Sequence, residues 1–209
     1  MPVEIQWLGH ASFRIAGAEA VIYIDPWKLD NSPHDGDIVI VSHSHYDHFS
    51  PDDIEKVSKS DTAIIAPGDV VAKLHVANAA TPGDRMTIKD VTAEAVAAYN
   101  IDKAFHPRTN NWLGVVLTID SKRVYYAGDT DFIPEMGDLQ DVDVALLPVG
   151  GTYTLDAEQA ATACKAIGCK MAVPYHWGDI VGSSSDAEKF IDLVECEGRL
   201  LQPGETLEI

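Results

Sequence analysis

The chain has 209 residues, of which 46% are hydrophobic and 23% are charged, and its formal net charge at pH 7 is −18. These proportions are ordinary for a globular protein and exclude a disordered or fibrous chain. A charge of this sign repels phosphate backbones, so we expect no nucleic-acid partner. The apolar stretches are far too short to cross a bilayer, so we expect no membrane partner either.

The chain start and the cysteines predict a cytoplasmic protein. Met1-Pro2-Val3-Glu4 leads directly into a strand pattern, without the basic start and apolar core of a signal peptide. Cys164, Cys169 and Cys196 are an odd and widely spread set, so we expect reduced thiols rather than a disulfide framework. No linker or repeat is visible, which predicts a single domain over residues 1–209. The oligomeric state stays open, and a homo-oligomer is one of the alternatives.

Short strands are predicted over the first 41 residues. Apolar residues alternate with polar ones over 3–7 and 13–15, and with 20–24 these segments are expected to form an antiparallel sheet. Residues 37–41 form an apolar run that ends in Ser42-His43, which is typical of a buried strand that brings its last residues to a site.

The middle of the chain alternates between helix and strand signals. Ser50-Pro51 predicts a helix start, with a capping hydroxyl and a proline at the first helical position. We then expect a strand over 62–66, a short helix after Pro67-Gly68, and strands near 86–88 and 92–97. A hairpin is predicted from 113–119 and 123–127, and a buried strand over 142–148.

Two helices are predicted near the C-terminus. The first spans about 156–167, buries Ala157, Ala160, Ala161, Cys164 and Ile167 on one face, and ends at Gly168. The second is expected to begin with a capping box over 185–188. Strands followed by helices in each half predict an α/β fold in which two sheets pack face to face with helices outside, a four-layer sandwich.

The strongest local signal is the run His43-Ser44-His45-Tyr46-Asp47-His48. Imidazole and carboxylate groups suit zinc and related divalent ions. Residues two apart on an extended segment point the same way, so His43 and His45 can share one ion, and the following turn can place Asp47 and His48 opposite them. The run therefore predicts a metal site; the alternative is a histidine-rich surface loop without metal.

The H-x-H-x-D-H pattern at a strand end resembles the hallmark of the metallo-β-lactamase superfamily. Further matches in chain order are Asp25 at the end of an early strand, His106, Asp129 in Gly128-Asp129-Thr130, and His176 in Pro174-Tyr175-His176-Trp177. The segments Trp7-Leu8-Gly9-His10-Ala11 and Pro148-Val149-Gly150-Gly151-Thr152-Tyr153 resemble a narrower branch. That branch contains compact metal-dependent hydrolases related to ascorbate-6-phosphate lactonase and to the phospholipase D that cleaves N-acyl phosphatidylethanolamine.

The resemblance implies an αββα sandwich of two mixed sheets and a site for two divalent metal ions. Zinc is the first expectation, and manganese, nickel and iron are alternatives. By this resemblance His43, His45 and His106 would hold one ion, Asp47, His48 and His176 would hold the second, and Asp129 would bridge both. Asp25 would then hold a ligand imidazole in its tautomer.

Other residues are candidates for contacts with a small-molecule substrate. His10 could polarise the substrate or only bond within a turn. Candidate pocket walls are Trp27, Asn100, Arg108, Asn111, Tyr153 and Trp177. Arg108 matters most if the substrate is anionic, because a guanidinium group pairs with phosphate or carboxylate in bidentate fashion.

The implied chemistry is hydrolysis of a small phosphodiester, lactone or related acyl compound by a metal-activated water. No serine elbow, P-loop or glycine-rich dinucleotide motif is present, so the metal would have to supply the nucleophile. Asp47 or Asp129 could orient that water and move its proton.

Three alternatives remain open at this point. The first is a non-haem iron redox enzyme of the same fold; His45 argues against it, because di-iron oxygen reductases of this fold usually carry a carboxylate there. The second is a nuclease, which the acidic composition disfavours. The third is a metal-binding protein without activity.

Overall fold

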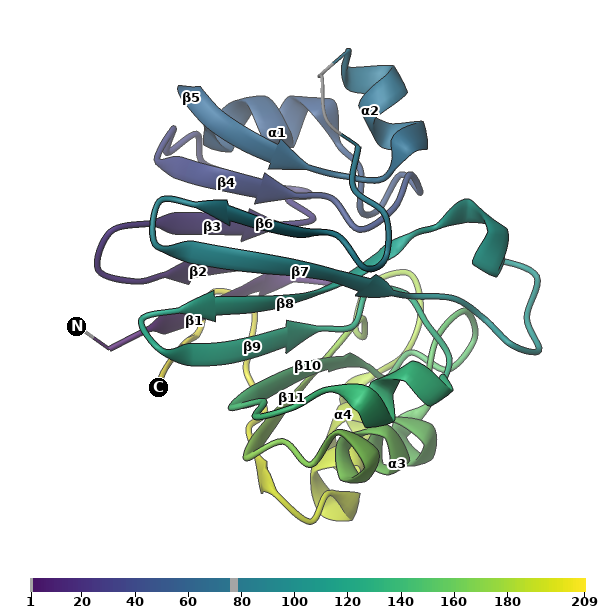
Figure 1. The fold of residues 1–209 in the computed structure, drawn as a ribbon. Coiled ribbons are helices and arrows are strands. Elements are labelled where there is room, and N and C mark those ends of the chain that lie inside the picture. The colour runs from purple at the N-terminus through teal and green to yellow at the C-terminus, as the bar shows by residue number, and fades with distance from the viewer. Residues whose placement is uncertain (1, 76–78) are drawn as a thin grey trace.

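The computed structural model describes residues 2–75 and 79–209. Within this described part, the strands form one sheet of six and one sheet of seven (Figure 1). The six-stranded sheet has the order β13-β1-β2-β3-β4-β5 and the seven-stranded sheet has the order β12-β11-β10-β9-β8-β7-β6. Both sheets are mixed, because each contains antiparallel and parallel pairs.

The first sheet is built from β1 (Glu4–Gly9), β2 (Ser12–Ala16), β3 (Val21–Ile24), β4 (Gly36–Ile40), β5 (Ser58–Ile65) and β13 (Thr206–Glu208). The second is built from β6 (Arg85–Ile88), β7 (Val91–Ala97), β8 (Leu113–Ile119), β9 (Lys122–Tyr126), β10 (Val144–Pro148), β11 (Met171–Tyr175) and β12 (Glu197–Gly198). In the first sheet β3, β4 and β5 run parallel. In the second, β9, β10, β11 and β12 run parallel.

Helices cover the outer faces of both sheets. The helices are α1 (Pro51–Val57) and α2 (Gly68–Leu74) on the first sheet, α3 (Ala157–Ile167) and α4 (Ser184–Leu193) on the second, and the short 3-10 helices η1 (Arg108–Asn110) and η2 (Pro134–Asp138). Figure 1 shows α1 and α2 at the top and α3 and α4 at the bottom, with the strands between them. The predicted four-layer α/β sandwich is therefore confirmed. None of the described helices is long and apolar enough to cross a membrane.

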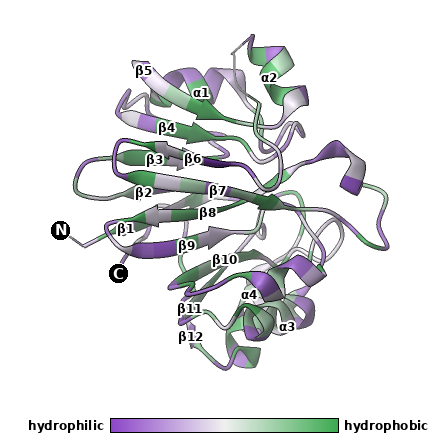
Figure 2. Ribbon diagram, in the orientation of Figure 1, coloured by the Kyte–Doolittle hydropathy of each residue, from purple (hydrophilic) through white to green (hydrophobic). Residues whose placement is uncertain are grey.

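The core lies between the two sheets and is built by alternation along the strands. In β1 and β2 the inward residues Ile5, Trp7, Phe13 and Ile15 are all buried, while Glu4, Gln6 and Arg14 are more exposed. β10 is buried on both faces and reads as a continuous apolar run. Figure 2 shows the same pattern, with much of the hydrophobic colour on the strands and much of the hydrophilic colour on loops and helix surfaces.

The start of the last helix differs from the prediction. The N-cap of α4 is Ser183, whose hydroxyl bonds to the Asp186 side chain, so the capping box is Ser183–Asp186 rather than 185–188. A second serine at position 185 provides the same sequence signal two residues later, and local sequence does not distinguish between the two. In the preceding helix, Ala163 is buried where Ala161 was expected, although Ala161 still packs against the core.

The strand β11 was not predicted because Pro174 lies within it. A proline lacks the N–H that a central strand donates, so its presence disfavours a strand. In the structure β12 pairs only with Met171 and Ala172, so on that side the ladder ends before Pro174. This arrangement lets β11 continue to Tyr175 and deliver His176 to the same edge of the molecule as the other strand ends.

Candidate metal centre

The predicted ligands come from segments that are distant in the chain but adjoin the same edge of the sandwich. His43–His48 follow β4, Asp129 lies three residues after the end of β9, and His176 follows β11. His106 lies in the long connection between β7 and β8, which projects at the right of Figure 1. Because parallel strands present their carboxyl ends at one edge, their following loops converge there.

Sharp turns bring several side chains into this edge immediately after a strand. His10, Asp25 and His176 all have positive φ, of 48°, 44° and 62°. Non-glycine residues rarely adopt this conformation, and residues that do are often held there by the surrounding structure at functional sites. Gly150 allows a close approach at the same edge, because a Cβ there would lie 2.6 Å from the His176 carbonyl oxygen.

A first group of three imidazoles gathers above β4. His43, His45 and His106 can place one ligand atom each within 4.8 Å of one another. His43 Nε2 lies 3.1 Å from His45 Nδ1, and His106 Nε2 lies 3.3 Å from Asp129 Oδ2. Three ring nitrogens so arranged match the ligand set of one zinc-like ion.

A second group lies beside the first and contains one residue more than expected. Asp47, His48, His176 and His10 can place ligand atoms within 4.8 Å of one another. His48 Nε2 and His176 Nε2 lie 3.8 and 3.9 Å from Asp47 Oδ2, and His10 Nε2 lies 3.0 Å from the same oxygen. The structure thus brings His10 into the cluster rather than into a separate turn.

Asp129 lies between the two groups. Its Oδ2 lies 3.3 Å from His106 Nε2, 3.2 Å from His176 Nε2 and 3.9 Å from His43 Nε2. Its Oδ1 lies 3.3 Å from His48 Nε2. One carboxylate therefore faces imidazoles of both groups, which is the position that a bridging ligand requires.

The Asp25 carboxylate forms hydrogen bonds with Ser42, Tyr126 and His48 on the buried side of the cluster. Its Oδ1 accepts the backbone N–H of Ser42 at 2.7 Å, and its Oδ2 accepts the Ser42 hydroxyl at 2.5 Å and the Tyr126 hydroxyl at 2.6 Å. Oδ2 also lies 2.8 Å from His48 Nδ1, which therefore carries the proton. The other ring nitrogen, His48 Nε2, faces Asp129 and is the atom that a metal ion would bind.

The orientations of the His43 and His106 rings are set in the same way, by hydrogen bonds at Nδ1. His43 Nδ1 lies 2.9 Å from the Ser42 hydroxyl oxygen, whose own hydrogen is donated to Asp25. His106 Nδ1 lies 2.9 Å from Asn100 Oδ1, and the His106 backbone N–H donates to the same oxygen. In both rings Nδ1 is tied back to the protein, so Nε2 is free to coordinate a metal.

Several buried atoms at the centre have no hydrogen-bond partner among the described residues. They include His48 Nε2, His106 Nε2, Asp129 Oδ1 and His176 Nε2. Buried polar atoms without partners are rare and costly, so four of them around one point indicate that something is missing there. Nitrogen lone pairs and carboxylate oxygens in this arrangement fit divalent cations.

The charge states are also set by the surroundings. Burial lowers the pKa of His43 well below its usual value, so this ring is neutral at pH 7. Burial alone would raise the pKa of Asp129, but His176 and His48 outweigh it and lower that pKa well below its usual value. Burial also opposes charge on His48, yet Asp129 and Asp25 raise its pKa, so a cation would have to displace a proton there.

A cleft of about 250 Å³ opens directly onto the cluster. Its lining residues are His45, Tyr46, Asp47, Phe105, His106, Asp129, Tyr153 and Ile180. Tyr46, Phe105 and Ile180 are among the most exposed large apolar side chains of the described residues. The sequence did not single out these three residues, because an exposed apolar residue in a loop has no local pattern.

Trp112 is another residue that the sequence did not indicate. Its ring centroid lies 4.9 Å from those of His43 and His45 and 5.6 Å from that of His106. It therefore packs against all three imidazoles of the first group and restricts their rotation.

Some predicted pocket residues lie away from the cleft. Arg108 is mostly exposed, bonds to Glu135 at 2.8 Å and adjoins a separate hollow with Asn111, so the expected anion contact is not supported. Trp177 and Trp27 line a neighbouring hollow on the His10 side. Asn100 does not line the cleft but forms hydrogen bonds with two residues that do, namely the His106 ring and the Tyr153 carbonyl.

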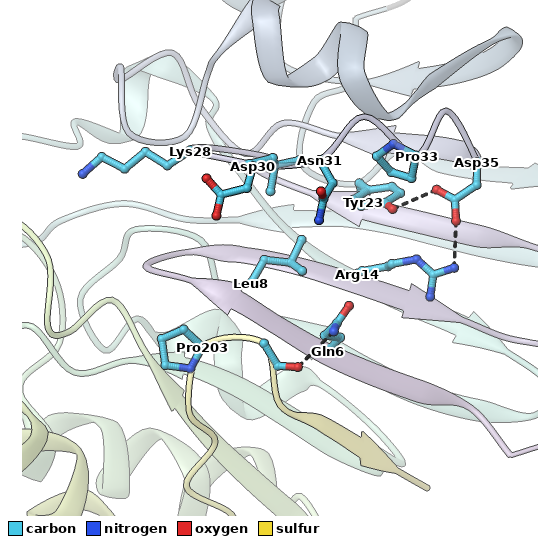
Figure 3. Close-up of a pocket in the computed structure, with 12 residues that line it drawn as sticks. Gln6, Leu8, Arg14, Tyr23, Lys28, Asp30, Asn31, Pro33, Asp35 and Pro203 are labelled. Atoms are coloured by element: carbon cyan, nitrogen blue, oxygen red, sulfur yellow. Dashed lines mark hydrogen bonds and ion pairs between the residues drawn. The ribbon is translucent and has the colours of Figure 1, made fainter.

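A larger hollow, of about 520 Å³, lies elsewhere, on the outer face of β1, β2 and β3 (Figure 3). Arg14 and Tyr23 both donate to Asp35 at 2.8 Å, and Lys28 donates to Asp179 outside the hollow at 2.7 Å. The hollow lacks the convergent, partnerless polar atoms of the metal cluster. We therefore place the chemistry at the smaller cleft.

Comparison with known proteins agrees with this geometry. Residues 4–176 match the family model of the beta-lactamase superfamily domain. Over 99% of its length the chain is 32% identical to a UPF0173 metal-dependent hydrolase of Methanoculleus marisnigri, 97% of which is covered. The chain belongs to the metallo-β-lactamase superfamily, within the UPF0173 metal-dependent hydrolases.

Solved structures show the same fold. A Parabacteroides distasonis protein superposes with a TM-score of 0.84 and 35% identity, over 96% of this chain and 94% of that one. Igni18, a metallo hydrolase of Ignicoccus hospitalis, gives a TM-score of 0.82 at 26% identity, over 100% of this chain and 99% of that one. The superfamily prediction is confirmed, whereas kinship with the lactonase and the phospholipase D stays a prediction.

Proposed function

We propose that this protein is a dinuclear zinc hydrolase that cleaves a small ester-like substrate, such as a lactone or another acyl compound, with an apolar group beside the scissile bond. The observation that carries the proposal is the set of partnerless buried atoms around Asp129. His43, His45 and His106 would hold one ion and Asp47, His48 and His176 the other, with Asp129 shared. Manganese, nickel and iron are the alternatives to zinc.

The residues that line the cleft favour a substrate with an apolar group. Phe105, Tyr153 and Ile180 line the cleft, and the Phe105 and Tyr153 rings pack edge to face at 4.6 Å. Among the described lining residues there is neither a lysine nor an arginine. A phosphate ester would therefore find no basic side chain, which favours an acyl substrate over a phosphodiester.

The metal pair would supply Lewis acidity and a water of lowered pKa. Asp129 faces four imidazoles, so both of its oxygens are committed to holding the centre together. Asp47 lines the open cleft, and His10 fixes its Oδ2, which leaves the second oxygen available to orient a water and accept its proton. Asp47 is thus the stronger candidate for the proton acceptor, and His10 is the residue that positions it.

The first test measures bound metal and rate of hydrolysis in the same protein samples. We expect zinc-reconstituted protein to bind two zinc ions per chain and to hydrolyse members of a lactone and aryl-ester panel faster than bis-p-nitrophenyl phosphate. Asp129→Ala should lose most of the bound metal and at least about 100-fold in kcat/KM, because both ions lose a shared ligand. Wild-type turnover that persists in Asp129→Ala, or after chelation, would contradict the proposal.

The cleft wall is tested separately with a matched pair of variants. Phe105→Ala should raise KM for substrates with a bulky apolar group and change kcat little, because it removes binding surface but no reacting group. Ile101→Ala is the control, since Ile101 is also exposed but does not line the cleft. Equal effects of the two variants would remove the argument for an apolar substrate.

The redox alternative has weaker support. The di-iron β-hydroxylase CmlA matches with a TM-score of 0.78 at 13% identity, which is a likeness of fold alone. Elemental analysis of natively purified protein separates the two cases. Iron without zinc, manganese or nickel, together with oxygen-dependent turnover, would favour redox chemistry over hydrolysis.

A further inference from the structure

The three cysteines, which the hydrolytic site does not use, meet at one place in the structure. Cys164 Sγ lies 3.0 Å from Cys169 Sγ and 3.2 Å from Cys196 Sγ, and the third separation is 3.9 Å. Cys164 and Cys169 are buried, and Cys196 is partly exposed. Within the described residues this is a cluster of three thiols that could each offer a sulfur to one ion.

The fold brings the cysteines together from three segments. Cys164 lies in the last turn of α3, and Gly168 ends that helix with φ of 66° and an N–H bond to the Cys164 carbonyl. This left-handed cap reverses the chain and places Cys169 against Cys164. Cys196 arrives after α4, directly before β12, which pairs with β11.

This cluster is separate from the hydrolytic site. Cys169 precedes β11 and His176 follows it, so the two lie at opposite ends of the strand. Seven residues of mostly extended chain correspond to about 20 Å. A ligand of the cysteines would therefore not contact the histidine cluster.

The sulfur triangle can accommodate an ion after a small adjustment. Sulfurs bound at about 2.3 Å in a tetrahedral zinc site lie about 3.8 Å apart. The Cys169–Cys196 separation of 3.9 Å already fits, and the two shorter sides must open by less than about 1 Å. A shift of the partly exposed Cys196 opens the Cys164–Cys196 side, and the buried Cys164 and Cys169 sulfurs must also separate by about 0.8 Å to reach the zinc-site spacing.

The electrostatic surroundings favour a cation over free thiolates. Glu195 and Glu197 flank Cys196 in the chain, and the molecule as a whole is strongly acidic. This negative charge would attract a divalent ion, which would displace the thiol protons as it binds.

We propose that Cys164, Cys169 and Cys196 form a second metal site, which binds one zinc-like divalent cation through three sulfurs. The fourth position would be open to water, because the described residues add no further histidine, cysteine or carboxylate to this group. By joining the end of α3 to the segment between α4 and β12, the ion would stabilise the outer layer of the second sheet.

The test uses Cd²⁺ as the probe, because cadmium thiolates absorb in the ultraviolet and cadmium bound to imidazole and carboxylate lacks that band. The full chain is freed of metal, reduced with a phosphine and titrated with Cd²⁺ while the ultraviolet absorbance is recorded. We expect the thiolate band to reach the intensity of one cadmium–thiolate centre per chain and to saturate by three added Cd²⁺ per chain, because the hydrolytic centre would take up two of them. Cys196→Ser, which alters a partly exposed position, should weaken this binding about tenfold or more, since losing even an outer partner costs a metal site that much.

Two further measurements keep the outcome decisive. His43→Ala should leave the thiolate band unchanged, and bound zinc should slow alkylation of Cys196 in the folded protein. Absence of the band in protein whose circular dichroism shows a native fold would overturn the proposal. A mass two hydrogens lower without reduction would overturn it as well, because it would show that two of the sulfurs form a disulfide.

Discussion

At the scale of single residues, the cluster depends on which nitrogen of each imidazole faces inward. Asp25, Ser42 and Asn100 tie back the Nδ1 atoms of His48, His43 and His106. These three polar residues are therefore as important for the centre as the ligands that they orient, since a ring in the wrong tautomer presents a hydrogen instead of a lone pair.

Asp25→Asn tests this orientation. The amide offers one acceptor oxygen where the carboxylate serves Ser42, Tyr126 and His48, so at least one donor loses its partner. We expect zinc affinity to fall by about 10- to 100-fold, measured by competition with a chromophoric chelator. Asp37→Asn is the control, because Asp37 is similarly buried but lies outside the cluster. Equal zinc affinity in Asp25→Asn and the wild type would refute the assigned role.

At the scale of elements, the helix caps show how local sequence sets boundaries. The Asp156 side chain accepts the Gln159 backbone N–H at 2.8 Å, and Gln159 accepts the Asp156 N–H at 3.1 Å. This reciprocal pair satisfies two groups at the start of α3 that would otherwise lack partners. The same helix carries Cys164 in its last turn.

Replacing the cap should destabilise the protein without affecting the hydrolytic centre. We expect Asp156→Ala to lower the free energy of unfolding by about 1 kcal/mol, as loss of an N-cap typically does. Asp156→Asn should retain most of the stability, because asparagine caps helices about as well. Urea unfolding followed by circular dichroism compares the three proteins, and equal losses in both variants would show that charge rather than capping is responsible.

The sequence predicted most elements because each was encoded locally. Alternation identified β1 and β2, and Ser50-Pro51 identified the start of α1, whose N-cap is Ser50. Predictions failed where distant pairing decides the structure. Whether Pro174 can lie in a strand depends on where β12 ends, and this information is not contained in the surrounding sequence.

The same distinction applies to the site. The run 43–48 is contiguous, so it was visible directly, and the other ligand positions could be assigned by resemblance. Arg108 shows the limit of this approach, because this basic residue two positions after His106 was a candidate for contact with an anionic substrate but pairs with Glu135. The cleft wall of Tyr46, Phe105 and Ile180 is assembled from three separate loops, and no local pattern predicts such a meeting.

At the scale of the whole molecule, a buried carboxylate links the two sheets at the end remote from the candidate metal centre. Asp37 is the second residue of β4, which is buried throughout, and it accepts the Val21 backbone N–H at 2.9 Å. It pairs with Lys59 of β5 and, at 2.5 Å, with Lys89 in the turn between β6 and β7. One side chain therefore holds together strands of the first sheet and a hairpin of the second.

This link predicts a pH dependence of stability. Burial alone would raise the pKa of Asp37, but Lys59 and Lys89 lower it to about 2 from its ordinary value of 3.8. The stabilisation is therefore complete above about pH 5 and is lost as the pH falls toward 2. We expect Asp37→Asn to cost about 2 kcal/mol at pH 7 and progressively less between pH 4 and pH 3.

Urea unfolding of the wild type and the variant at each pH measures the difference. Asp192→Asn is the control, because it removes the same charge from the exposed surface of α4 and should give a small difference that does not change with pH. A constant gap for Asp37→Asn between pH 7 and pH 3 would show that its ion pairs do not contribute.

The pairing of the first and last strands has a practical consequence. Glu4 at the start of β1 lies opposite Glu208 of β13, whereas His10, which belongs to the candidate metal cluster, follows the other end of β1. Six extended residues place about 20 Å between them. A fusion partner or a surface tether attached at either end would therefore leave the mouth of the cleft unobstructed, which suits immobilised screening of compound libraries.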